Sequence, residues 1–179
     1  AATLGDVEQV QKHILQLGKR CARSGRRTAL HVAAEKGHVE CVRLLYPEAG
    51  YFTEDHKTAL MLAAAHNHVE LVKLLIPMEA GMRANSGTTA LMKAAHNGHL
   101  EVCKLLLEKE AGLTRRDGWT ALMSAAANNR CDVIQLLLST EQRMATHDGT
   151  TALHKAVVHG FPDAVRLLGK LLLGLSGFL

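Results

Sequence analysis

The sequence predicts an all-helical chain built from a short repeated unit, and two observations support this. The first is composition: among 179 residues there are 29 Leu and 25 Ala, whereas Phe, Tyr and Trp make up only 3%. This balance favours helices, because β-sheets are enriched in β-branched and aromatic residues. The second is a Thr-Ala-Leu triplet, which recurs at spacings of 30 or 31 residues from Thr28, Thr58, Thr89, Thr120 and Thr151. A period of this length is typical of solenoid proteins.

Each copy of the unit is expected to form two short helices. The threonine hydroxyl can cap the first helix, and residues such as Leu91, Ala94 and Ala95 place one apolar face at helical spacing. An Asn-Gly-His or Lys-Gly-His segment then breaks the helix and makes a tight turn. The second helix is again apolar at helical spacing, and a polar linker of about ten residues precedes the next threonine.

This unit resembles the ankyrin repeat, in which a Thr-Pro-Leu-His-x-Ala-Ala helix, a Gly-His turn, a hydrophobic helix and a hairpin loop follow one another. The resemblance implies an all-α solenoid of stacked helix-turn-helix units with short hairpin loops. It covers residues 28–179 as five repeats, starting near residues 28, 58, 89, 120 and 151. Residues 1–27 are expected to be a partial N-terminal unit and a basic linker. The chain opens inside a first helix, either as a small cap or because it was cut there.

Two departures from the family pattern stand out. The repeats run 30 or 31 residues instead of the family's usual 33, and the shortening is expected in the hairpin between repeats. The family's His after Thr-x-Leu survives only as His31 and His154, with Met at the other three copies. The TALM and EAG phrases resemble ankyrin arrays of single-celled eukaryotes, which stand alone or follow a protein kinase domain.

The formal net charge of +4 is concentrated in one segment, because residues 19–27 hold five Lys and Arg and no acid. A dedicated nucleic-acid-binding protein carries a basic face over a whole domain, so no nucleic-acid partner is expected. The segment is interpreted as a solvated loop, with contact to nucleic acid, anionic lipid or an acidic peptide as the alternative.

Cysteine usage and the chain ends bear on location. The four cysteines, Cys21, Cys41, Cys103 and Cys131, lie far apart without a CxxC pair, which is typical of reduced thiols in an intracellular protein. No signal peptide is visible, and no apolar stretch is long enough to span a membrane. The expected location is therefore the cytoplasm, with cytoskeletal association or the nucleus as alternatives.

Neither a metal site nor catalysis is expected from the motifs. His66, His68, His96 and His99 occupy matching places in adjacent repeats, so zinc binding by two imidazole pairs is one hypothesis. The favoured interpretation is structural, with each turn histidine bonded to the local backbone. Phosphate-binding glycine motifs and a GxSxG nucleophile motif are missing. The chain is therefore predicted to be no enzyme and to hold no cofactor.

The candidate binding residues are those that vary while the repeat frame stays fixed. In the ankyrin family the hairpin tips and the inner face of the first helix form a concave partner surface. The resemblance therefore implies a partner-binding set of Arg27, Lys57, Trp119, Glu35, Lys36, His66, His96, Asn97, Asn128, His159, Lys93 and Lys155.

Trp119 is singled out as the only tryptophan of the chain. In an exposed hairpin it is expected to contact a partner, so that its removal weakens binding and barely changes stability. The alternative is that it packs against the neighbouring hairpin.

The predicted function is a non-catalytic protein–protein interaction scaffold that binds a partner protein on its concave surface. Two alternatives remain: the targeting region of a protein kinase whose catalytic domain lies outside this chain, or a structural cytoskeletal element. Residues 167–179 are rich in leucine and carry only one charged residue, Lys170. Because a terminal repeat needs a polar outer face, weak self-association through this tail is also expected.

Overall fold

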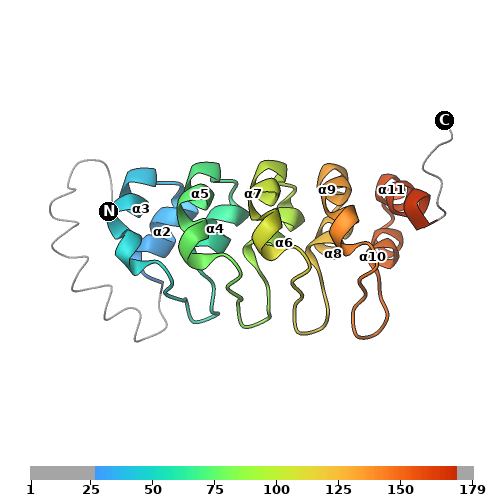
Figure 1. Cartoon of the computed structure of the whole chain (residues 1–179), viewed down its shortest axis with the longest axis horizontal. Coiled ribbons are helices and arrows are strands. Elements are labelled where there is room, and N and C mark those ends of the chain that lie inside the picture. Colours follow the sequence, from blue (N-terminus) through green and yellow to red (C-terminus); the bar gives the residue numbers. More distant parts are fainter. Residues whose placement is uncertain (1–26, 173–179) are drawn as a thin grey trace.

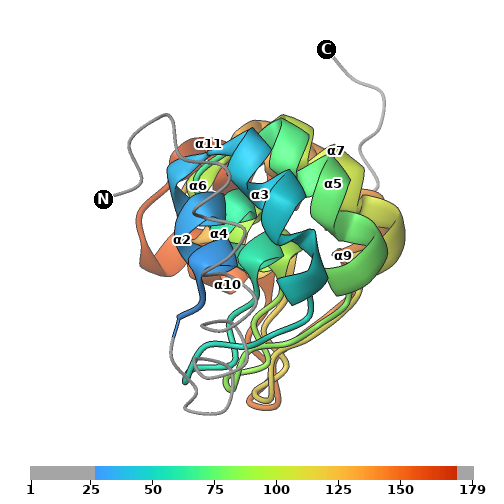
Figure 2. The same cartoon turned by 90° about the vertical axis from the view of Figure 1, so that its left-hand side faces the viewer.

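The computed structural model describes residues 27–172, with side chains described as far as residue 169. Helices alternate along the chain in two layers, and hairpin loops project together from one edge of the stack (Figure 1). Seen along the stack, the loops extend away from the helices on one side (Figure 2). The predicted all-α repeat architecture is confirmed.

Five helix pairs make up this stack. The first helices of the pairs are α2 (Ala29–Lys36), α4 (Ala59–Ala65), α6 (Ala90–Asn97), α8 (Ala121–Ala126) and α10 (Ala152–Val158). The second helices are α3 (Val39–Leu45), α5 (Val69–Glu79), α7 (Leu100–Glu110), α9 (Cys131–Glu141) and α11 (Pro162–Leu172). Residues 1–26, which hold most of the predicted partial unit and basic segment, lie outside the described residues.

Each first helix begins directly after the threonine of a Thr-Ala-Leu triplet. The side chains of Thr58, Thr89 and Thr120 accept a hydrogen bond from the backbone N–H three residues later, at 3.3, 3.4 and 3.2 Å. In the first pair, Nδ1 of His31 instead accepts from the Thr28 backbone N–H at 3.2 Å and lies 2.9 Å from its hydroxyl oxygen. The predicted capping is therefore present, and methionine at the third position does not prevent it.

The turn after the first helix requires a left-handed backbone. Gly37 and Gly98 have φ of 79° and 83°, and Asn67 and Asn129 occupy the same place with φ of 61° and 53°. Glycine adopts this conformation without strain, and asparagine tolerates it better than most residues. The turn therefore accepts only these residue types readily.

The core lies between the two layers and continues through the whole stack. Leu30, Leu60, Leu91 and Leu122 are fully buried or nearly so, and so are the paired alanines that follow each of them. Successive first helices pack directly on one another, which the small alanine side chains permit. Stability of such an array comes from contacts between neighbouring repeats.

The first repeat differs at the end of its second helix. Its sequence reads Leu-Leu-Tyr-Pro-Glu where the next repeat reads Leu-Leu-Ile-Pro-Met-Glu, one residue longer. The chain compensates with a 3-10 helix, Tyr46–Glu48 (η1), which advances with fewer residues per turn than an α-helix. Relative to the next repeat, the missing residue of the first repeat therefore lies in the second helix and not in the predicted hairpin.

A buried glutamate at the end of each of the second helices α5, α7 and α9 links its repeat to the preceding one, and sequence reasoning missed this role. Glu79, Glu110 and Glu141 are each 1% exposed. One carboxylate oxygen of Glu110 accepts from the backbone N–H of Leu91 at 2.7 Å, at the start of its own repeat. The other accepts from Gly81 of the preceding repeat at 3.0 Å. The recurring Glu-Ala-Gly segment therefore supplies both groups that connect repeats. Its Glu accepts a hydrogen bond from the preceding repeat, and its Gly donates one to the Glu of the next repeat.

The same two contacts recur along the stack. Glu79 accepts from Leu60 at 2.6 Å and Gly50 at 2.9 Å, and Glu141 accepts from Leu122 at 2.7 Å and Gly112 at 2.9 Å. Burial raises the pKa of Glu79 and Glu110, while the backbone hydrogen bonds oppose that rise.

The hairpin loops also touch one another through the backbone. The Arg116 N–H donates to Ser86 O at 3.3 Å, and the His147 N–H donates to Asp117 O at 3.0 Å. A Cβ atom on Gly118 would lie 2.9 Å from the Cα of Thr146. The loops therefore form a continuous row. Their close spacing at Gly118 leaves no room for a side chain there.

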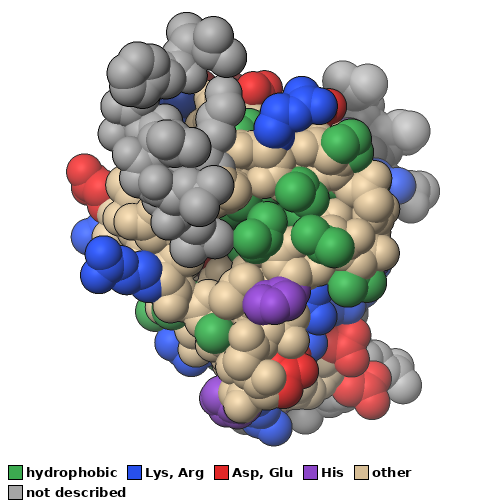
Figure 3. Space-filling view, turned by 90° about the vertical axis from the view of Figure 1, so that its right-hand side faces the viewer, with side chains coloured by type: hydrophobic (Ala, Val, Ile, Leu, Met, Phe, Trp, Pro, Cys, Tyr) green, Lys and Arg blue, Asp and Glu red, His purple; other side chains and the backbone are tan. Residues whose placement is uncertain are grey.

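The C-terminal end of the stack is apolar. Val157 and Val158 of α10 are 58% and 78% exposed, and hydrophobic side chains gather on this end face (Figure 3). Most of the tail predicted to self-associate, residues 173–179, lies outside the described residues. Self-association therefore stays a prediction.

Replacing Glu110 with alanine tests the joint between repeats. Two buried backbone N–H groups would lose their charged acceptor, so we expect Glu110→Ala to lower the free energy of unfolding by about 3 kcal/mol. Glu108→Ala, on the exposed side of the same helix, should change it by less than about 0.5 kcal/mol. Urea denaturation followed by circular dichroism measures both, and equal losses would contradict this role for Glu110.

His31 supplies a pH-dependent contribution to stability. Its ring is fully buried, and burial lowers its pKa below the ordinary 6.5. A lowered pKa in the folded state means that its stabilising contribution is complete above about pH 6.5 and is lost as the pH falls toward the folded-state pKa. His31→Met introduces the residue that three other repeats use at this place. We expect thermal melts of the wild type to lose more stability on acidification than those of this variant, and parallel pH curves would refute it.

Candidate functional site

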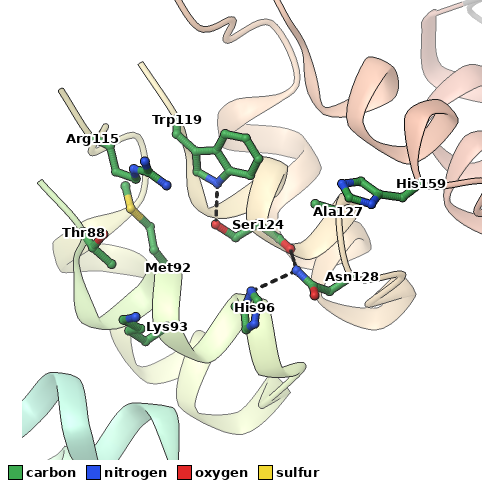
Figure 4. Close-up of a pocket in the computed structure, with 10 residues that line it drawn as sticks. All are labelled: Thr88, Met92, Lys93, His96, Arg115, Trp119, Ser124, Ala127, Asn128 and His159. Carbon is green, nitrogen blue, oxygen red and sulfur yellow. Dashed lines mark hydrogen bonds between the residues drawn. The ribbon is translucent and has the colours of Figure 1, made fainter. Parts of the chain in front are cut away.

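A cavity of about 370 Å³ opens at the base of the hairpin loops, over α6 and α8. Its wall combines Thr88 and Trp119, which lie in loops just before first helices, with the cations Lys93 and Arg115 (Figure 4). The lining residues are Thr88, Met92, Lys93, His96, Arg115, Trp119, Ser124, Ala127, Asn128 and His159. They come from α6, α8, the end of α10 and the loops before α6 and α8, so only the stacked array assembles this surface.

Trp119 forms one side of the cavity and is held in place. Its indole N–H donates to Ser124 Oγ at 2.8 Å, and the Ser124 hydroxyl donates to Thr120 O at 3.0 Å. The indole is partly buried and packs against the core. The indole is therefore held by contacts to α8 and the core, and its predicted contact with a partner stays a prediction.

Two cations lie near the Trp119 ring. The Arg115 guanidinium carbon is 5.5 Å from the ring centroid, and the Lys155 Nζ of α10 is 4.7 Å from it. Both distances suit cation–π attraction. The ring therefore connects the loop before α8 to α10, and positive charge lies beside its apolar surface.

The far wall of the cavity is a polar pair that spans two repeats. The Asn128 side-chain amide lies 3.0 Å from Nδ1 of His96 and donates to Ser124 O at 2.8 Å. Burial lowers the pKa of His96, and the positive charges of Lys93 and Arg130 lower it further. This pair thus presents a neutral, hydrogen-bonding wall, with Lys93 three residues before His96 on α6.

The structure brings together about half of the predicted binding residues. Lys93, His96, Trp119, Asn128 and His159 line the cavity, and Lys155 lies against the indole. The remaining predicted residues do not line it: Arg27, Glu35, Lys36, Lys57, His66 and Asn97.

Some of these remaining side chains have local partners. Arg27 pairs with Glu35, Lys57 pairs with Asp55 at 2.9 Å, and the Asn97 amide donates to Ala65 O at 2.8 Å. These contacts do not test whether the residues bind a partner, so their role stays a prediction.

Arg115 was missed by sequence reasoning, although one signal points to it. The Arg115 backbone N–H donates to Trp119 O at 2.8 Å, which closes a tight hairpin around Asp117 and Gly118. An Asp-Gly pair is a common turn signal. The turn therefore sets Arg115 opposite Trp119, which lies four residues later in the chain.

The turn histidines make contacts between repeats and not within one. His68 Nε2 lies 3.0 Å from Glu35 O, and His99 Nε2 lies 3.0 Å from Ala65 O, each in the preceding repeat. The expected local backbone contact is therefore wrong for these two rings. Among the described residues, no three His, Cys, Asp or Glu side chains lie close enough to hold a metal ion.

The described cysteines include one that is deeply buried. Burial raises the pKa of the Cys103 thiol to about 12, so at neutral pH it is protonated and a poor nucleophile. Cys41 and Cys131 are partly exposed and free of disulfides. Cys103 thus behaves as a small apolar core residue.

Comparison with known families agrees with the architecture. The family model "Ankyrin repeats (3 copies)" matches residues 1–86, 60–148 and 109–172, which overlap along most of the chain. The chain belongs to the ankyrin repeat family. Ankyrin repeats are generally protein–protein interaction modules, and a protein partner is the general expectation for this chain.

A search of curated proteins found no match. No helix in the described part is long and apolar enough to cross a membrane.

The contacts of Trp119 change the expected outcome of removing it. Trp119→Ala loses the bond to Ser124 and partly buried packing, so we expect the free energy of unfolding to fall by about 2 kcal/mol. Trp119→Phe, which keeps an aromatic ring, should cost about 1 kcal/mol. Thr88→Ala, at the same place in the preceding repeat, is the control with little expected effect. Urea denaturation gives all three values. An unchanged free energy of unfolding for Trp119→Ala would show that the indole does not stabilise the fold.

Proposed function

We propose that this protein is a non-catalytic scaffold that binds a partner protein on the surface formed by the hairpin loops and the first helices. The single observation that carries the proposal is the cavity that successive repeats share. It gathers residues at positions that vary between repeats, including Lys93, Trp119 and Asn128.

The division between fixed and variable positions supports this proposal. Side chains that recur in every repeat, such as the Thr and Leu of the triplet, are largely buried and hold the stack together. The variable side chains, such as Lys93, His96 and His159, stay at least partly accessible. Because the buried side chains hold the stack together, the accessible side chains can differ from repeat to repeat. Such a surface suits recognition of one partner.

The rigidity of the surface also favours binding. Buried carboxylates join the repeats, and backbone hydrogen bonds join the loops. Since the surface is preformed, little conformational entropy is lost when a partner docks, and more of the contact energy contributes to affinity.

Affinity purification with paired variants tests the proposal. We expect Lys155→Ala with His159→Ala, on the loop side, to lose a stoichiometric partner that the wild type retains. The matched control is Lys73→Ala with Lys104→Ala, two exposed lysines of the second-helix layer. Loss of the partner by the control alone, or equally by both, would place binding elsewhere. Thermal melts of both variants establish that neither has unfolded.

A further inference from the structure

The loops around the cavity beside Trp119 differ from one another in charge. The loops carry an acid at one place near the tip, namely Asp55, Asp117 and Asp148, but the loop before α6 carries Ser86 there. Asp55 pairs with Lys57 at 2.9 Å, and Asp117 pairs with Arg115 at 3.1 Å. The loop directly before the helix of Lys93 therefore lacks the acid that the neighbouring loops carry.

Lys93 has no carboxylate partner among the described residues. It is half-buried on α6 and lines the cavity. Its pKa is lowered first by burial and then by the positive charges of Lys57 and Arg115. A half-buried cation whose influential neighbours are also cations is destabilised unless an anion approaches it.

Arg115 supplies a second unused group on the same cavity. Its Nε is buried and has no hydrogen-bond acceptor in the described part of the chain, although its terminal nitrogen reaches Asp117. A buried donor without an acceptor is unfavourable, and a ligand that brings one relieves this cost. Lys93 and Arg115 thus offer positive charge and a free donor to one cavity.

The remaining surface of the cavity is apolar or neutral. Trp119, Met92 and Ala127 present aromatic, thioether and methyl surface, and none of the lining residues is an acid. An aliphatic side chain can pack here beside the cations, and no acid of the cavity wall repels an incoming carboxylate.

Resting on the function proposed above, we propose that this cavity receives an acidic segment of the partner protein. A Glu or Asp side chain of that segment binds between Lys93 and Arg115, and an adjacent aliphatic side chain packs on Trp119 and Met92. The neutral wall of His96 and Asn128 lies next to the backbone of the bound segment and offers it hydrogen-bonding groups. Electrostatic complementarity of this kind contributes to both the rate and the specificity of association.

A capped glutamate-rich peptide that contains leucine is the probe. The intact chain reports on binding through the fluorescence of Trp119, its single tryptophan, and calorimetry gives the affinity. We expect the same peptide with glutamine at every glutamate to bind at least about tenfold more weakly. Equal binding of the two peptides, or no binding of the acidic one, would overturn the proposal.

Variants of the chain locate the charge that the peptide uses. Lys93→Gln should weaken binding of the acidic peptide about tenfold, while Lys93→Arg should preserve it. Lys104→Gln removes the same charge from the second-helix layer of the same repeat and should leave affinity unchanged. Equal losses for Lys93→Gln and Lys104→Gln would show a general charge effect and refute the site. Because Lys93→Gln relieves repulsion between cations, its melting temperature is expected to equal or slightly exceed that of the wild type.

An oligothymidylate of similar length separates the peptide from a nucleic acid. Its phosphates could meet the cations while its bases stack on Trp119. Tighter binding of the oligonucleotide than of the acidic peptide would overturn the proposal. Failure of the peptide, with a natural partner still lost by the Lys155 and His159 variant, would remove this inference and leave the proposed function standing.

Discussion

The arrangement of the repeats depends on a buried glutamate carboxylate that accepts hydrogen bonds from two neighbouring repeats. A glutamate at the end of each long second helix up to α9 accepts one backbone N–H from the start of its own repeat and one from the loop of the repeat before it. A charged acceptor in a buried site is costly unless its hydrogen bonds are satisfied. The carboxylate therefore favours one spacing of neighbouring repeats, the spacing at which both donors reach it.

That spacing has consequences for the loops. When neighbouring repeats are held at a constant separation, the hairpins can form hydrogen bonds from one to the next, as Arg116 does with Ser86. Gly118 shows how close this approach is, because a side-chain carbon there would meet the backbone of Thr146. The loops thus act as one wall, and the cavity beside them is as well defined as the helical stack.

The surface around the cavity brings together side chains that no single repeat contains. Lys93 comes from α6, Trp119 from the loop before α8, and Lys155 from α10. Each is unremarkable in its own repeat, but their alignment brings Lys155 of α10 to the same aromatic ring that Arg115 of the loop before α8 approaches. The absence of an acid at Ser86 matters only in this setting, because it is the geometry of the stack that places Lys57, Lys93 and Arg115 within electrostatic reach of one another.

The sequence by itself determined the repeat period, the position of each first helix and the identity of the main core residues. These follow from local rules: a threonine caps a helix, an apolar face recurs at helical spacing, and glycine or asparagine permits a left-handed turn. The family and its general role also follow from these motifs. The variable positions were predicted as candidate contacts, and several of them do line the cavity.

Only the tertiary structure decided which of these positions meet. The residues of the cavity are about one repeat apart in the sequence, and their proximity depends on how repeats stack, which no local pattern specifies. The same reason explains the misses. Glu110 reads as one more polar residue at a helix end until the preceding repeat supplies Gly81, and Arg115 reads as a loop cation until the hairpin turns it toward Trp119. Contacts that cross between repeats depend on three-dimensional geometry, whereas helix starts and turns depend on neighbours in the chain.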